Sequence, residues 1–181
     1  MPIIDPKVED PTRDMLGHAI RGELQDLAPL IQSVGDERYK QALGLCLIAA
    51  AYVAVDVSGR WPTDADVREI AGQVSERGTE ITLDEADVYD YLSGAALGFR
   101  PLTEVFGDDV AAVTLPLLIT GSMVFMFRPK GQKWWDYLDQ IWSAYEVAET
   151  AGVSALPALE VRARMLKEAA GRDAKIGRAH V

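Results

Sequence analysis

Cysteine is nearly absent from this chain, which holds a single cysteine, Cys46, among 181 residues. No disulfide can form within the chain, and no zinc site can be built from several thiolates. This scarcity fits a reducing compartment. The N-terminus lacks the basic segment and apolar run of a signal peptide. We therefore expect a cytoplasmic protein.

Basic residues are also scarce. Lys and Arg together number 18 against 28 Asp and Glu, so the formal net charge is −10. Such a charge repels phosphate backbones unless a local basic patch overrides it. A helix pair expected at 63–77 and 83–97 could imitate a helix-turn-helix, but its second helix contains acidic residues and neither Lys nor Arg. Nucleic acid is therefore not expected as a partner.

The motifs of common enzyme classes are missing as well. The sequence contains no G-x-S-x-G, no G-x-G-x-x-G and no phosphate-binding G-x-x-x-x-G-K-[ST]. His18 is the only histidine before residue 175, so any Ser–His or Cys–His pair would have to use it. Cys46 lies between two leucines, where a thiol behaves as a small buried hydrophobe. We expect no catalytic residues and no cofactor.

Two long apolar stretches are what the chain does have. Residues 110–127 contain no charged residue, and residues 42–55 are apolar on every side of a helix. A helix without a polar face must be surrounded, either by protein or by lipid. We expect two apolar helices, at about 42–55 and 108–127, to form the centre of a bundle.

The rest of the chain has the spacing of amphipathic helices. Apolar residues recur at intervals of three and four, and prolines, glycines and capping residues mark the ends. Residues 1–11 hold three prolines and are expected to form an irregular arm. Residues 12–172 are expected to form a single all-α domain of six to eight helices.

Local signals predict where several helices begin and end. Thr12 can cap the first helix, and Pro29 is expected to kink or end it. A second helix is expected over residues 36–57. Two later helices are expected to open with capping boxes, in which the paired residues are three positions apart. These pairs are Thr63 with Asp66, and Thr82 with Glu85.

The C-terminal part divides into two segments. A last amphipathic helix is expected at about 155–170. Residues 175–181, Lys-Ile-Gly-Arg-Ala-His-Val, resemble the in-frame translation of a sequencing adapter. We treat these residues as an artefact, exclude them from the fold and give His180 no functional weight.

A membrane is the other environment that could surround residues 108–127. The uncharged stretch reaches the lower limit for a span, and basic and aromatic residues follow it. Pro116 and Gly121, together with hydroxyl side chains, weaken insertion into lipid. Residues 42–55 are equally apolar but too short to span. We favour a protein core, and a membrane-attached protein anchored by 108–127 is an alternative.

Two pairs of carboxylates raise a different alternative. Asp84 and Asp87 lie three residues apart, and Glu146 and Glu149 form a second pair with the same spacing. A metal-dependent enzyme built on helical carboxylates would require the two pairs to converge around one ion. A solvated acidic surface is the simpler interpretation, so we expect no metal site.

One short segment, Arg128-Pro-Lys-Gly-Gln-Lys-Trp-Trp135, combines basic and aromatic residues. Trp and Arg are over-represented among the residues that dominate protein–protein binding. Trp134 is expected to pack inside the bundle. The candidate partner-binding residues are Arg128, Lys130, Lys133, Trp135 and Trp142.

The sequence as a whole predicts a non-enzymatic helical module that binds or regulates another protein. This hypothesis depends on the missing catalytic motifs and on the exposed aromatic surface expected between residues 134 and 142. The composition, rich in Ala, Val, Asp and Arg, is typical of high-GC bacteria. The identity of the partner stays open, and self-association is one option.

Overall fold

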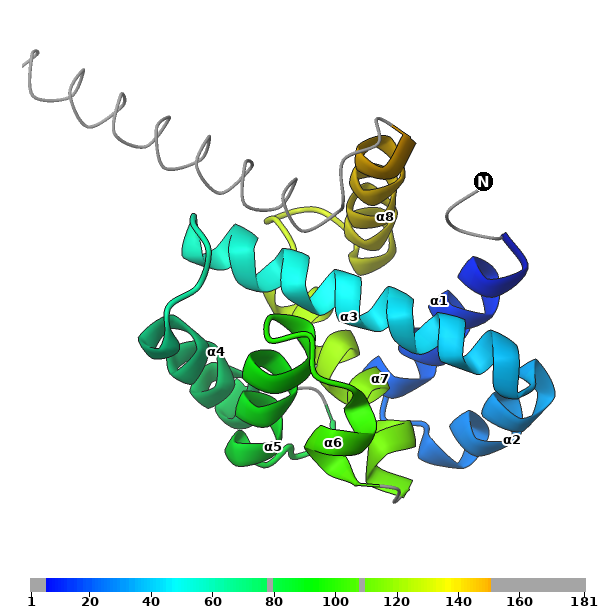
Figure 1. Ribbon diagram of the computed structural model, residues 1–181. Coiled ribbons are helices and arrows are strands. Elements are labelled where there is room, and N and C mark those ends of the chain that lie inside the picture. Colours follow the sequence, from blue (N-terminus) through cyan, green and yellow to red (C-terminus); the bar gives the residue numbers. More distant parts are fainter. Residues whose placement is uncertain (1–5, 78–79, 108–109, 151–181) are drawn as a thin grey trace, which may run out of the picture.

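The computed structural model describes residues 6–77, 80–107 and 110–150 (Figure 1). These residues form eight α-helices and one π-helix, and no strand occurs among them, which confirms the predicted all-α class. The predicted helix at 155–170 and the tail at 175–181 lie outside the described residues. The elements are α1 (Pro6–Ile20), α2 (Leu24–Val34), α3 (Asp36–Ser58), α4 (Asp64–Arg77), α5 (Glu85–Asp90), η1 (Tyr91–Ala96), α6 (Leu102–Phe106), α7 (Val110–Phe127) and α8 (Trp134–Thr150).

Helix α3 crosses the centre of the molecule, as predicted for residues 36–57 (Figure 1). Every residue from Ala49 to Val55 is buried because α3 packs against α1, α2, α4, α7, α8 and η1. Its end is set by Gly59, whose left-handed backbone (φ 67°) turns the chain while its N–H donates to the carbonyl of Val55.

Helix α7 packs against α3 and α1, and its middle residues are enclosed by protein. Its polar side chains find partners there. Thr120 Oγ1 donates to the carbonyl of Cys46 at 3.3 Å and lies 2.9 Å from the hydroxyl of Tyr91. Among the described side chains of α7, the large apolar ones exposed to solvent are Val113 and Phe125.

The length of α3 changes which of the two apolar helices could span a membrane. Within the described residues, α3 is the one helix that is long and apolar enough to cross a membrane, and 56% of its apolar window is buried inside the molecule. The prediction that this segment is too short to span was wrong, because the helix continues beyond residues 42–55 at both ends. The apolar stretch described for α7, Ala112–Phe127, is shorter.

The predicted irregular arm at residues 1–11 is wrong for its described part, residues 6–11. Residues 6–11 belong to α1 because Pro6 occupies the first helical position, where its missing N–H has no partner to lose. Thr12 therefore lies inside the helix and is not its cap. Its buried hydroxyl donates to the carbonyl of Val8 at 2.6 Å.

The first helix ends at a glycine and not at the predicted proline. The chain turns between α1 and α2 at Gly22 (φ 72°), whereas Pro29 lies inside α2. A Cβ placed on Gly22 would lie 2.8 Å from the Cβ of Glu80, so the turn needs both a left-handed backbone and a missing side chain.

One predicted capping box is present and the other is not. Thr63 N–H donates to Asp66 Oδ2 at 2.8 Å, and Asp66 N–H donates to Thr63 Oγ1 at 3.2 Å. Thr82 does not cap α5. That helix begins at Glu85, because Asp84, two residues after Thr82, caps it by accepting a 2.9 Å hydrogen bond from the N–H of Ala86.

Candidate functional site

The basic–aromatic surface, defined here as residues 128–135, connects the end of α7 to the start of α8. It carries Arg128, Lys130 and Lys133, and the sequence has no Asp or Glu between Asp109 and Asp136. Positive charge is therefore concentrated at one place in a chain whose formal net charge is −10. A local patch of this kind attracts negatively charged groups at short range.

Trp135 is the exposed aromatic residue of this surface. Its side chain is 41% exposed, whereas its neighbour Trp134 is half-buried against the core. The two rings meet edge to face with centroids 5.6 Å apart, and Lys133 Nζ lies 5.1 Å from the Trp135 ring. These contacts position the indole at the surface.

The other two cations of the surface differ in how they are held. The guanidinium of Arg128 lies 4.3 Å from the Phe125 ring and donates to the carbonyl of Phe125. Lys130 is exposed beside Gly131, whose positive φ of 82° lets the loop turn. The backbone of the surface is thus anchored to the end of α7.

Trp142 does not lie on the surface, although the sequence placed it there. Its side chain is only 2% exposed, and the guanidinium of Arg13 lies 5.7 Å from its ring. Arg13 also pairs with Asp139 of α8 and with Glu9 of its own helix. The indole Nε1 of Trp142 is buried with no hydrogen-bond partner among the described residues. Trp142 therefore fixes α8 to α1.

A depression of about 330 Å³ lies between α1 and the start of α8. Trp134 and Trp135 form one wall, and Gly17 of α1 lies opposite the Trp134 ring. The remaining lining residues are polar or charged, and they are Arg13, Asp14, His18 and Arg21. The depression therefore has an aromatic wall on one side and is also lined by two arginines.

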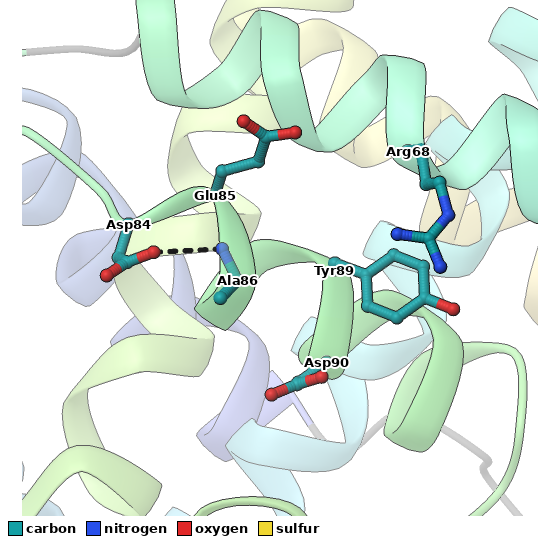
Figure 2. Close-up of a pocket in the computed structure, with 6 residues that line it drawn as sticks. All are labelled: Arg68, Asp84, Glu85, Ala86, Tyr89 and Asp90. Atoms are coloured by element: carbon teal, nitrogen blue, oxygen red, sulfur yellow. Dashed lines mark hydrogen bonds between the residues drawn. The ribbon is translucent and has the colours of Figure 1, made fainter.

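A second depression, of about 410 Å³, lies between α4 and α5 (Figure 2). Figure 2 shows Arg68 beside the ring of Tyr89, with Glu85 and Asp90 on either side of this pair. The Arg68 guanidinium lies 4.5 Å from the Tyr89 ring, and the Tyr89 hydroxyl donates to Asp64 at 2.5 Å. Asp64 also accepts from Arg68 at 2.8 Å, so these groups are joined in one ion-paired network.

The two predicted carboxylate pairs are not brought together. Asp84 and Asp87 belong to the start of α5, which lies on the opposite side of α3 from α8 (Figure 1). Asp84 caps its helix, and burial, followed by repulsion from Asp84 and Asp90, raises the pKa of Asp87. Glu146 is exposed on α8, and the side chain of Glu149 lies outside the described residues. No shared ion site follows from these pairs.

The residues that a nucleophile–base pair would need have other surroundings. Cys46 is fully buried in α3, and this burial raises the pKa of its thiol to about 12. His18 lies near the end of α1, where its Nδ1 is 2.6 Å from Glu23 Oε2. A thiol held in its neutral form among apolar side chains is a poor nucleophile.

The sequence interpretation missed a group of three potential metal ligands. Ligand atoms of His18, Glu23 and Asp26 all lie within 4.8 Å of one another. On one continuous helix these residues would point in different directions, whereas the turn at Gly22 gathers them. The signal was present as a glycine between the histidine and the two acids.

We also compared the chain with known proteins. No protein-family model matches the chain, and no curated protein and no solved structure is detectably similar to it.

Proposed function

We propose that this chain is a non-enzymatic module that binds an acidic segment of another protein through the basic–aromatic surface. The observation that carries the proposal is the exposed ring of Trp135, held by Lys133 within a stretch that has no carboxylate. We place this function in the cytoplasm, as the scarcity of cysteine suggests.

Charge supports an acidic partner over a neutral or basic one. Electrostatic attraction in the cell extends over roughly 8 Å before salt screens it. The three cations of the surface act within that range, while the acidic remainder of the chain repels a negatively charged partner elsewhere. An acidic segment is thus steered to this surface and kept off the others.

The aromatic wall supports an apolar anchor within that acidic segment. A partner side chain that enters the depression would contact the rings of Trp134 and Trp135, and carboxylates beside it would face Arg13 and Arg21. Buried aromatic rings and arginines are the residues whose loss most weakens protein interfaces. The preformed ring positions also lower the conformational entropy lost on binding.

The proposal is tested by selecting peptides from a random displayed library on the immobilised full chain. We expect enrichment of peptides that combine Asp or Glu with one large apolar residue. Binding of a selected peptide is expected to be lost in Trp135→Ala and in Lys133→Glu. Matched controls are Phe99→Ala, which removes a ring that is 58% exposed elsewhere, and Lys40→Glu on α3, and both are expected to bind normally.

Three results would contradict the proposal. The first is a failure to enrich acidic peptides, and the second is peptide binding that survives both Trp135→Ala and Lys133→Glu. The third is sedimentation of the chain with phosphatidylserine-containing vesicles that depends on Trp135, because the surface would then recognise a lipid headgroup region instead of a protein segment. Vesicles of phosphatidylcholine alone provide the reference for that experiment.

A further inference from the structure

We propose that His18, Glu23 and Asp26 form a binding site for one divalent transition-metal ion, for which zinc is the test ion. The site adjoins the basic–aromatic surface, because His18 also lines the depression beside Trp134 and Trp135, but zinc binding does not depend on the function proposed above. Its three ligand atoms come from the end of α1 and the start of α2, and they lie within 4.8 Å of one another.

The turn between the two helices fixes the relative position of the ligands. Gly22 has a left-handed backbone, and a Cβ built there would lie 2.8 Å from the Cβ of Glu80, so a side chain has no room. The N–H of Glu23 donates to the carbonyl of His18 at 2.9 Å, which ties the second ligand to the first. Asp26 follows in the first turn of α2, with its N–H donating to the carbonyl of Glu23. The three ligands are therefore positioned without any ion.

Glu23 can hold the ion and an arginine together because its two oxygens have different partners. Oε2 lies 2.6 Å from His18 Nδ1, while Oε1 lies 3.0 Å from the Nε of Arg21. Both oxygens of the Glu23 carboxylate are thus oriented by neighbouring side chains. Arg21 would then orient the metal-binding carboxylate from behind, as outer partners do in known metal sites.

Only small movements separate this arrangement from tetrahedral zinc coordination. Zinc bonds of about 2.0–2.2 Å place neighbouring ligand atoms about 3.3 Å apart. Nδ1 and Oε2 must separate slightly from their 2.6 Å contact, and the exposed side chain of Asp26 must approach. When the ion takes the lone pair of Nδ1, the imidazole proton resides on Nε2, and Arg21 Nη2, 3.4 Å from Nδ1, must move aside.

The ligand types determine which ion is expected. An imidazole with two carboxylates suits zinc and its transition-metal neighbours, whereas magnesium prefers oxygen ligands and retains its water. Three protein ligands leave the fourth tetrahedral position to water.

The test is calorimetric titration of zinc chloride into the chelator-treated full chain. We expect one ion per chain, with at least about tenfold weaker binding in His18→Gln and in Asp26→Asn, because loss of an orienting partner alone weakens metal binding by about 10–100-fold. Matched controls are His180→Gln, which removes the other histidine, and Asp84→Asn, and both are expected to bind as the parent chain does. Magnesium chloride should give no binding at the site.

Three results of the zinc titration would overturn the proposal. They are no zinc binding by the parent chain, zinc binding that survives His18→Gln, and zinc binding that is lost in His180→Gln. Asp26 is exposed, so Asp26→Asn retains the fold even if His18→Gln does not, and unchanged zinc affinity in that variant would also count against the site. Circular dichroism of each variant confirms that the helices remain.

Discussion

At the scale of a single residue, two tryptophans of α8 show that packing neighbours determine whether a side chain is exposed or buried. Trp135 and Trp142 are seven residues apart, so they point in nearly the same direction from the helix. Arg13 lies against the ring of Trp142, which is buried, whereas Trp135 faces the depression beside α1 and is 41% exposed. Helical spacing predicts direction, but it does not show how far the neighbouring helix extends. The sequence therefore identified the aromatic surface and assigned one ring too many to it.

Cys46 leads to a prediction about alkaline stability. Burial raises the pKa of its thiol from 9.0 to about 12 in the folded chain, and burial also raises the pKa of Tyr91. Each group binds its proton more tightly when folded, so its contribution to stability is complete below the unfolded pKa and is lost as pH rises toward the folded pKa. The urea midpoint is expected to fall between about pH 9 and 12.

The matched variant for this experiment is Cys46→Ala. It removes one titrating group and leaves the tyrosines, so the alkaline fall in the urea midpoint is expected to become shallower without vanishing. An unchanged slope would show that the thiol titrates alike in the folded and unfolded chain. Reaction of the folded parent chain with a thiol reagent at neutral pH would also contradict the burial of Cys46.

At the scale of helices, two glycines in the two central helices predict opposite effects of substitution. Gly44 in α3 has no atom within 4 Å of a built Cβ, so Gly44→Ala should raise the free energy of unfolding by about 0.5–1 kcal/mol. Gly121 in α7 faces α1, where a Cβ would lie 3.2 Å from Ile20 Cγ1. Gly121→Val should lower the free energy of unfolding by about 1–3 kcal/mol.

Urea unfolding of both variants against the parent chain measures this difference. The two glycines serve as controls for each other, because both lie in long apolar helices and differ in the space beside them. If Gly121→Val were as stable as the parent chain, α1 and α7 would not be in the close contact described above. A destabilising Gly44→Ala would imply a covering neighbour over that side of α3.

The helices themselves were predictable where the signal was local. The bounds of α3 and the capping box of Thr63 with Asp66 follow from apolar runs, glycines and capping residues that the sequence displays. The first helix break was only partly predictable in this way, because Gly22 and Pro29 are both local signals for a break. The contact that leaves no room for a side chain at Gly22 comes from Glu80, about sixty residues along the chain, and this contact has no local signal.

The same break explains why part of the candidate chemistry was missed. With α1 and α2 taken as one helix, His18 and the two acids pointed apart and suggested nothing. Once the chain turns at Gly22, their ligand atoms gather within 4.8 Å. One wrongly predicted helix end thus concealed this group of ligand atoms. The same error did not affect the prediction of the two apolar central helices, which depends on other residues.

At the scale of the whole molecule, the two apolar helices are surrounded largely by their own chain. Helix α3 packs against six other elements, and the middle of α7 is enclosed between α1 and α3. We therefore predict that the chain stays in the supernatant after high-speed centrifugation without detergent. Recovery in the membrane pellet, released only by detergent, would favour the alternative in which one of these helices lies in lipid.

The central claim is that the basic–aromatic surface receives an acidic segment, and its most direct test is an equilibrium titration. A selected acidic peptide is titrated against the parent chain, Trp135→Ala and Phe99→Ala at low and high salt. The account predicts that Trp135→Ala weakens binding by about 30-fold, corresponding to about 2 kcal/mol. It also predicts that salt weakens parent binding and that Phe99→Ala has no effect. Equal affinity for the parent chain and Trp135→Ala would contradict the account.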